Sequence, residues 1–155
     1  DFGMDYLSER GLIPVLNKRV LQEKVPILGI CLGMQLMTQK SEEGVRPGLG
    51  WVNAETVKFS FNGDSPRKKV PHMGWSRVQT HKGSNLFRNH DDEYRFYFVH
   101  SYHVVCHDLE DVLTSTKYGF DFVSSFQKEN IMGVQFHPEK SHRYGMELMN
   151  HFAQS

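Results

Sequence analysis

The protein has 155 residues, which is enough for one domain with a hydrophobic core. Lys and Arg together number 18, as do Asp and Glu, so the formal net charge is zero and gives no electrostatic reason to expect a nucleic acid or an anionic membrane as partner. No apolar run approaches the roughly 20 residues that span a bilayer, and we expect no signal peptide. Two cysteines, Cys31 and Cys106, are too few for a disulfide scaffold, so the expected location is the reducing cytoplasm.

The first third of the chain predicts helix, strand and helix. Residues 5–22 carry apolar side chains at loosely helical spacing, and Pro14 predicts that they divide into two shorter helices. Residues 25–30 form a continuous apolar run, which is typical of a strand buried on both faces of a parallel sheet. Helix-forming residues follow from 32 to 40. A strand, a sharp turn and a helix are therefore expected around Cys31.

The rest of the chain is rich in β-forming residues. Extended segments are expected within 51–61, 95–105 and 112–116, with a turn at 62–66. Residues 122–126 and 131–136 form a hairpin-like pair joined through 127–130, and residues 141–153 form the last helix with Ser141 as N-cap. This pattern predicts a single α/β domain, residues 1–155, with a parallel core and an antiparallel-rich second half.

Cys31 lies in the segment Gly29-Ile30-Cys31-Leu32-Gly33, which has the form Gly-x-nucleophile-x-Gly. Such a turn strains the backbone of the nucleophile, and small residues two positions either side let the chain pass without clashes. The start of the following helix favours a thiolate and an adjacent oxyanion, to which Leu32 is placed to donate its backbone N–H. A cysteine after an apolar strand is also a common core residue, so both interpretations stay open, whereas Cys106 is interpreted as structural.

The candidate base is His137, with Glu139 to orient it. The predicted strand ends at these residues, and positions i and i+2 of an extended chain face the same way. Pro138 fixes its own φ and favours an extended His137. His137 would take a proton from Cys31 and return one to the leaving ammonia. The alternative is structural: His137 caps a strand and Glu139 begins a helix favourably.

No metal or other cofactor is predicted. The closest histidine pairs, His100 with His103 and His137 with His142, lack a second tight pair of Cys or His ligands at zinc-finger spacing.

Two blocks, residues 31–35 and 133–139, resemble the class I glutamine amidotransferases in composition and order. Residues 71–75 and 97–102 are more narrowly similar to the glutaminase subunits of imidazole glycerol phosphate synthases, and the resemblance extends over essentially the whole chain. It implies an α/β fold that is flavodoxin-like, with a mostly parallel sheet flanked by helices. It also implies hydrolysis of glutamine through a thioester and passage of ammonia to a (β/α)₈ cyclase subunit in a heterodimer. That cyclase makes imidazole glycerol phosphate and aminoimidazole carboxamide ribotide in histidine biosynthesis.

The resemblance further implies residue roles. The catalytic triad would be Cys31, His137 and Glu139. Substrate-binding positions match Gln35, Glu43, His100, Ser101 and Tyr102, with Glu43 suited to the α-ammonium group and the backbone of 100–102 to the α-carboxylate. Positions that face the cyclase match Trp75, Tyr97 and Lys140, which without the family would be two core aromatics and a solvated charge.

The sequence departs from the family in two places. The family's domain begins before Asp1, with a strand–helix–strand start and a loop that supplies part of the oxyanion hole. Because losing one oxyanion donor can cost roughly 10²–10³ in rate, we expect the chain as given to be unstable or inactive and its full-length parent to be active.

Ser76 also stands where the family usually has Asn. Residues 125–128 and 141–146 look like amidotransferases that supply ammonia for amidino groups on surface sugars. That pathway and a non-catalytic scaffold are the alternative functions.

Overall fold

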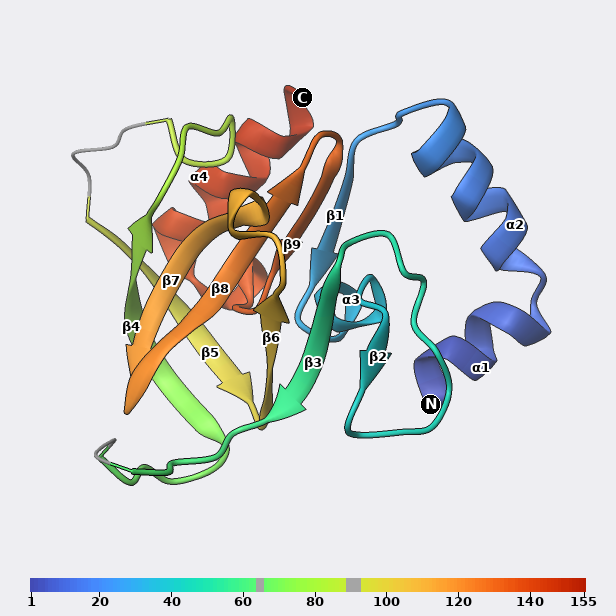
Figure 1. Ribbon diagram of the computed structural model, residues 1–155. Helices are drawn as coiled ribbons and strands as arrows, with labels where there is room; N and C mark the ends of the chain where they lie inside the picture. The colour runs from blue at the N-terminus through green and yellow to red at the C-terminus, as the bar shows by residue number, and fades with distance from the viewer. Residues whose placement is uncertain (64–65, 89–92) are drawn as a thin grey trace.

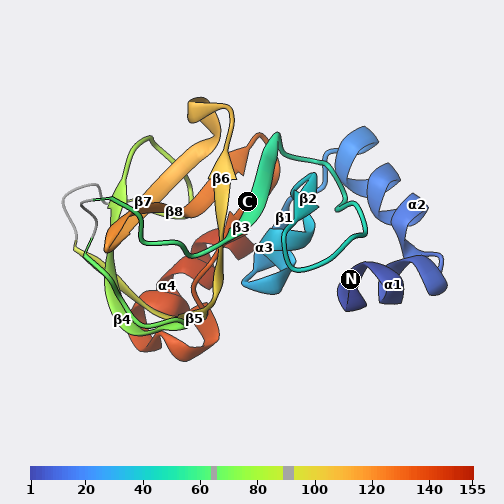
Figure 2. The same ribbon diagram turned by 60° about the horizontal axis from the view of Figure 1, so that its bottom comes forward.

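The computed structural model describes residues 1–63, 66–88 and 93–155, and Figure 1 traces the chain. Within these residues, nine strands form one mixed sheet. The last helix, α4 (His142–Ala153), packs on the sheet, and helices α1 (Phe2–Glu9) and α2 (Leu12–Asn17) lie together beyond β1 (Ile27–Ile30), as Figures 1 and 2 show. No helix in the described ranges combines the length and hydrophobicity that crossing a bilayer would require.

The predicted helical stretch does divide in two, but not at Pro14. The break is at Gly11, whose positive φ of 65° suits glycine, and α2 continues through Pro14 into a π-helical turn at Lys18–Gln22. Pro14 is the third residue of α2, and backbone N–H groups in the first turn of a helix have no partner within it. A proline is therefore tolerated there. The predicted strand, turn and helix around Cys31 are confirmed as β1 and α3 (Leu32–Leu36).

The remaining strands follow along the chain as β2 (Lys40–Ser41), β3 (Ala54–Lys58), β4 (His72–Thr80), β5 (Tyr94–His100), β6 (Tyr102–Cys106), β7 (Val112–Tyr118), β8 (Phe120–Lys128) and β9 (Ile131–Val134). Their order in the sheet is β2-β3-β6-β8-β7-β4-β5, with β9 between β8 and β1. Short 3₁₀ turns cover Leu109–Asp111 and Pro138–Lys140. The turn expected at 62–66 lies partly outside the described residues.

The expectation of a mostly parallel sheet is wrong for the described strands. Pairing is parallel between β1 and β9 and between β2 and β3, whereas the other pairs are antiparallel. Only Gly119 separates β7 from β8, and two residues separate β8 from β9. A parallel crossover needs a dozen or more residues, so these connections allow only antiparallel neighbours. The predicted antiparallel second half, including the β8–β9 pair, is confirmed.

Strand β4 was not predicted, because few of its residues are β-branched and its sequence lacks a clear apolar alternation. It pairs with β5 over seven consecutive positions, from His72↔His100 to Val78↔Tyr94. Long-range pairing therefore supplies the extended structure that the local sequence does not specify.

Two buried clusters hold the elements together. One lies beneath α4 and includes Phe96, Phe136 and Leu148, with the two phenylalanine rings stacked at a centroid distance of 3.8 Å. The other packs against α3 and includes Met34 and Phe126. Phe136 is completely buried. Because it directly precedes His137, its packing fixes where the chain leaves β9.

The packing of α4 gives the first prediction. Leu148 is 1% exposed, whereas Met146 on the same helix is 69% exposed. Leu148→Ala should lower the free energy of unfolding by about 2–5 kcal/mol, because a cavity remains beneath α4. Met146→Ala should change it by less than about 0.5 kcal/mol. Urea denaturation followed by circular dichroism measures both, and equal losses in the two variants would contradict the position of α4.

Candidate active site

Cys31 occupies a strained turn between β1 and α3. Its backbone has φ 51° and ψ −103°, a conformation that non-glycine residues rarely adopt. Its N–H donates a hydrogen bond of 2.8 Å to the carbonyl oxygen of Val134, which continues the parallel β1–β9 pairing by one residue. The turn that the Gly-x-Cys-x-Gly pattern predicts is therefore present and is anchored to the neighbouring strand.

The two glycines flanking the turn are not equivalent. A Cβ atom on Gly29 would lie 2.7 Å from the backbone carbon of Gly33 and 2.8 Å from its oxygen. A Cβ atom on Gly33 would meet nothing within 4 Å among the residues that the structure describes. The steric role expected of both glycines therefore applies to Gly29 alone.

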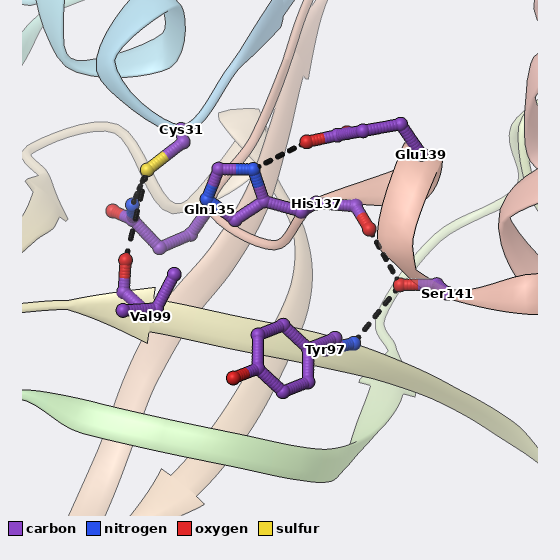
Figure 3. Close-up of polar contacts among 7 residues, drawn as sticks. All are labelled: Cys31, Tyr97, Val99, Gln135, His137, Glu139 and Ser141. Atoms are coloured by element: carbon purple, nitrogen blue, oxygen red, sulfur yellow. Dashed lines mark hydrogen bonds and ion pairs between the residues drawn. The ribbon is translucent and has the colours of Figure 1, made fainter.

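His137 contacts Glu139 at the end of β9. Its Nδ1 lies 2.6 Å from Glu139 Oε1, and Figure 3 shows the imidazole between Glu139 and Cys31, with its other edge turned toward the sulfur side. His137 has the expected extended backbone, with φ −105° and ψ 96°. Glu139, however, lies in the 3₁₀ turn that starts at Pro138 rather than in an extended chain. The carboxylate is about half exposed and the imidazole is largely covered.

Ser141 holds this segment against β5. Its hydroxyl donates to the His137 carbonyl oxygen at 2.6 Å and accepts from the Tyr97 N–H at 2.9 Å, as Figure 3 shows. The His137 N–H also donates to the Tyr97 carbonyl oxygen at 2.9 Å. The sequence predicted Ser141 as N-cap of the last helix. It occupies that position, but its side chain makes no capping hydrogen bond and braces His137 instead.

The surroundings of the Cys31 sulfur shift its pKa in both directions. Burial raises the pKa of the Cys31 thiol, while hydrogen bonds from the Leu32 N–H and from Gln135 act to lower it. Among charged neighbours, the Glu139 carboxylate raises the thiol pKa and the Lys140 ammonium lowers it. A thiol in this setting stays protonated more readily than an exposed one, so its ionisation depends on a base and on hydrogen-bond donors.

Gln135 is a contact that the sequence reasoning missed. It is completely buried, and its Nε2 lies 3.6 Å from the Cys31 sulfur. The sequence feature that could have indicated it is an amide side chain between Val134 and Phe136, at the end of an apolar strand. A polar group buried in such a place needs a hydrogen-bond partner.

The expected substrate-binding residues fall into two groups. Gln35 and Glu43 line one small cavity of about 40 Å³, together with the expected oxyanion donor Leu32, Asp1 and parts of the 40–48 loop. Residues His100, Ser101 and Tyr102 do not line this cavity, but the Tyr102 carbonyl oxygen accepts a hydrogen bond of 3.3 Å from Gln35 Nε2.

The expected partner-facing residues gather near the start of α4. Trp75 is 46% exposed, so it is not a core aromatic. Its ring meets that of Tyr97 edge-on at 6.2 Å and stacks on His142 at 5.7 Å. Lys140 is exposed in the adjoining turn. This aromatic surface borders the segment that carries His137 and Glu139.

The other titratable candidates stay apart from this site. Cys106 is buried, which raises the pKa of its thiol to about 12, and this agrees with a structural role. Within residues 1–63, 66–88 and 93–155, no group of three or more His, Cys, Asp or Glu side chains is arranged to hold a metal ion.

Because only Gly29 lacks room for a Cβ atom, alanine substitutions at Gly29 and Gly33 should have different effects on stability. Gly29→Ala should destabilise the protein by several kcal/mol or prevent folding, because backbone atoms rather than a flexible side chain block the new methyl group. Gly33→Ala should leave stability unchanged or raise it by up to about 1 kcal/mol, because alanine favours a helix. Thermal unfolding of both variants measures the difference. A destabilised Gly33→Ala beside a stable Gly29→Ala would contradict the turn geometry.

Comparison with known proteins identifies the family. The model for class I glutamine amidotransferases matches residues 3–154. The chain is 54% identical over 152 residues to imidazole glycerol phosphate synthase subunit HisH 2 of Methanococcus maripaludis, covering 98% of this chain and 74% of that protein. It is 42% identical over 154 residues to the subunit HisH 2 of Pseudomonas aeruginosa, covering 99% of this chain and 75% of that protein.

Solved structures support the same fold. A glutamine amidotransferase aligns with a TM-score of 0.68 at 16% identity, over 96% of this chain and 69% of that one. A glutamine amidotransferase from Thermotoga maritima aligns with a TM-score of 0.59 at 18% identity, over 97% of this chain and 56% of that one. The match to the family model over nearly the whole sequence, together with these relatives, shows that the chain belongs to the class I glutamine amidotransferases.

Proposed function

We propose that the protein hydrolyses glutamine to glutamate and ammonia, with Cys31 as nucleophile, His137 as base and Glu139 as the group that orients the base. The observation that carries this proposal is the 2.6 Å contact between His137 Nδ1 and Glu139, with the opposite edge of the imidazole toward Cys31. A carboxylate on Nδ1 leaves Nε2 free to accept a proton, which is the tautomer that a general base requires.

The reaction takes two steps at Cys31. His137 accepts the thiol proton while the sulfur attacks the side-chain amide carbon of glutamine, and the resulting oxyanion is stabilised by the Leu32 N–H. Collapse breaks the C–N bond, His137 returns the proton to the leaving ammonia, and a thioester remains. Water then attacks the thioester carbon and loses its proton to His137, which passes it to the departing sulfur and releases glutamate. The base is needed because Cys31 is partly buried, and this burial raises the pKa of its thiol and disfavours the free thiolate.

Glutamine would bind at the cavity lined by Leu32, Gln35 and Glu43, with the Glu43 carboxylate toward the α-ammonium group. At about 40 Å³ the cavity is much smaller than the roughly 300 Å³ or more of typical small-molecule sites. Substrate binding would therefore widen it, and Glu43 lies on the exposed loop that could move outward.

The ammonia would pass to a cyclase subunit that makes imidazole glycerol phosphate, in a heterodimer. The names of the relatives at 54% and 42% identity support this acceptor over an amidino sugar. The exposed aromatic surface around Trp75 offers a place for the partner, next to the segment that carries the base. A non-catalytic scaffold would have no need for the His137–Glu139 contact. Both cysteines are free, which favours a reducing cytoplasmic location.

Labelling with a diazoketone analogue of glutamine tests the nucleophile. We expect one label per chain, on Cys31, because only this thiol lies beside a base, and glutamine should prevent the reaction. Cys31→Ser should remove labelling, whereas Cys106→Ser should keep it. Mass spectrometry of the peptides locates the label. Undiminished labelling of Cys31→Ser, or an unlabelled full-length parent, would contradict the proposal.

Replacement of Glu139 tests the orienting group. Glu139→Gln should lower kcat by about 10²-fold, because the imidazole loses the carboxylate that selects its tautomer. KM for glutamine should change little, since Glu139 does not line the cavity. The control is Glu147→Gln, which removes one negative charge from α4. An assay of glutamate formation compares the three proteins, and a Glu139→Gln variant as active as the control would contradict this role.

A further inference from the structure

A chain of hydrogen bonds runs from Ser76 in β4, through the side chains of two buried histidines, to Tyr102, the first residue of β6. Ser76 Oγ lies 2.9 Å from His72 Nε2, and His72 Nδ1 lies 2.9 Å from His100 Nε2. His100 Nδ1 in turn lies 2.8 Å from the Tyr102 carbonyl oxygen. Both imidazoles are buried, at 2% exposed for His72 and 6% for His100. Buried polar groups with this many partners specify one arrangement rather than several.

The Tyr102 carbonyl oxygen determines which atoms donate and which accept along these hydrogen bonds. A carbonyl oxygen only accepts, so His100 Nδ1 carries a proton. Burial lowers the pKa of His100 to about 3 and that of His72 to about 4, so both rings are neutral at pH 7. A neutral imidazole has one N–H, so His100 Nε2 accepts from His72 Nδ1, and His72 Nε2 accepts from Ser76. Every donor and acceptor along the chain is thereby fixed.

A second branch leads from the same carbonyl to the sulfur. Gln35 must present its Nε2 to the Tyr102 oxygen, at 3.3 Å, because an amide oxygen would repel it. The same Nε2 lies 3.1 Å from Gln135 Oε1. Gln135 must therefore turn its oxygen toward Gln35, which leaves its Nε2 toward the Cys31 sulfur at 3.6 Å. The opposite amide orientation would place an oxygen lone pair against the sulfur.

We propose that Gln135 is a further catalytic residue, whose amide N–H donates to the Cys31 thiolate. Gln35 and the buried His72–His100 pair are positioning residues that hold this amide in the donating orientation through the Tyr102 carbonyl group. The proposal rests on the proposed role of Cys31 as nucleophile. Its physical basis is that a partly buried thiolate has less water around it than an exposed one, so a side-chain donor supplements the Leu32 N–H. The charged groups near the sulfur are Glu139 and Lys140, which act in opposite directions, and His137 faces it as the base.

The test is the rate at which iodoacetamide alkylates Cys31 across a range of pH, with peptide mass spectrometry to separate Cys31 from Cys106. Gln135→Met keeps a side chain of similar length and removes the donor. We expect its alkylation at neutral pH to be about ten-fold slower, because one hydrogen bond to a charged sulfur is lost, and its pH profile to move to higher pH. Gln79→Met, the same change at an exposed position of β4, should match the native protein.

Gln35→Met provides a second variant, since Gln135 stays in place but loses its orienting partner. Its alkylation should be slowed by a smaller factor, about two- to three-fold, because the amide then samples both orientations. The readout requires no glutamine turnover. A native protein that alkylates at Cys31 but hydrolyses no glutamine would therefore remove the proposed function and still test this one. Folded Gln135→Met and Gln35→Met proteins with the native alkylation profile would overturn the proposal.

The tautomers provide an independent measurement. Nitrogen-15 NMR at pH 7 should show His72 and His100 as neutral rings, both protonated at Nδ1. Protonation of His100 at Nε2 instead would remove the hydrogen bond from His100 Nδ1 to the Tyr102 carbonyl oxygen, and would contradict the positioning role of the His72–His100 pair.

Discussion

The site depends on the parallel pairing of β1 with β9. The register sets Ile30 opposite Val134, and the Cys31 N–H extends it by donating to the Val134 carbonyl oxygen at 2.8 Å. Parallel neighbours end at the same edge of a sheet, so the residues that follow each strand emerge together. Gln135 reaches the sulfur across 104 positions of sequence for this reason. A shift of the register by one residue would turn Gln135 and His137 to the other face.

This pairing also holds the strained turn in place. A non-glycine residue in such a conformation costs about 1–3 kcal/mol, which the surrounding structure must offset. The Val134 hydrogen bond restrains the turn from below, and the close approach of Gly29 to Gly33 lets α3 start directly after it. On the other side of the site, Phe136 and Ser141 fix the chain around His137. The reacting groups therefore sit on braced elements, which is what positions a base for proton transfer.

The sequence predicted the features that local signals encode. The apolar run before Cys31, the flanking glycines and the spacing of His137 and Glu139 indicated the turn and the residue contact, and the motif blocks indicated the family, which the comparisons confirm. Features made by distant segments were not predictable. The sequence of β4 gives little indication of a strand, and its extended structure comes from pairing with β5. The mixture of parallel and antiparallel pairs depends on which strands become neighbours in the sheet. The bracing by Ser141 and the amide orientation of Gln135 likewise depend on atoms that tertiary structure brings together.

The central claim is that the β1–β9 register brings the Cys31 sulfur to the free nitrogen of His137. A crystal structure of the protein after reaction with a glutamine-analogue electrophile tests it most directly. The account predicts a carbon bonded to Cys31 Sγ, His137 Nε2 within about 4 Å of that sulfur, and Nδ1 still on Glu139. An adduct on another residue, or an imidazole turned to the opposite face of the sheet, would contradict it.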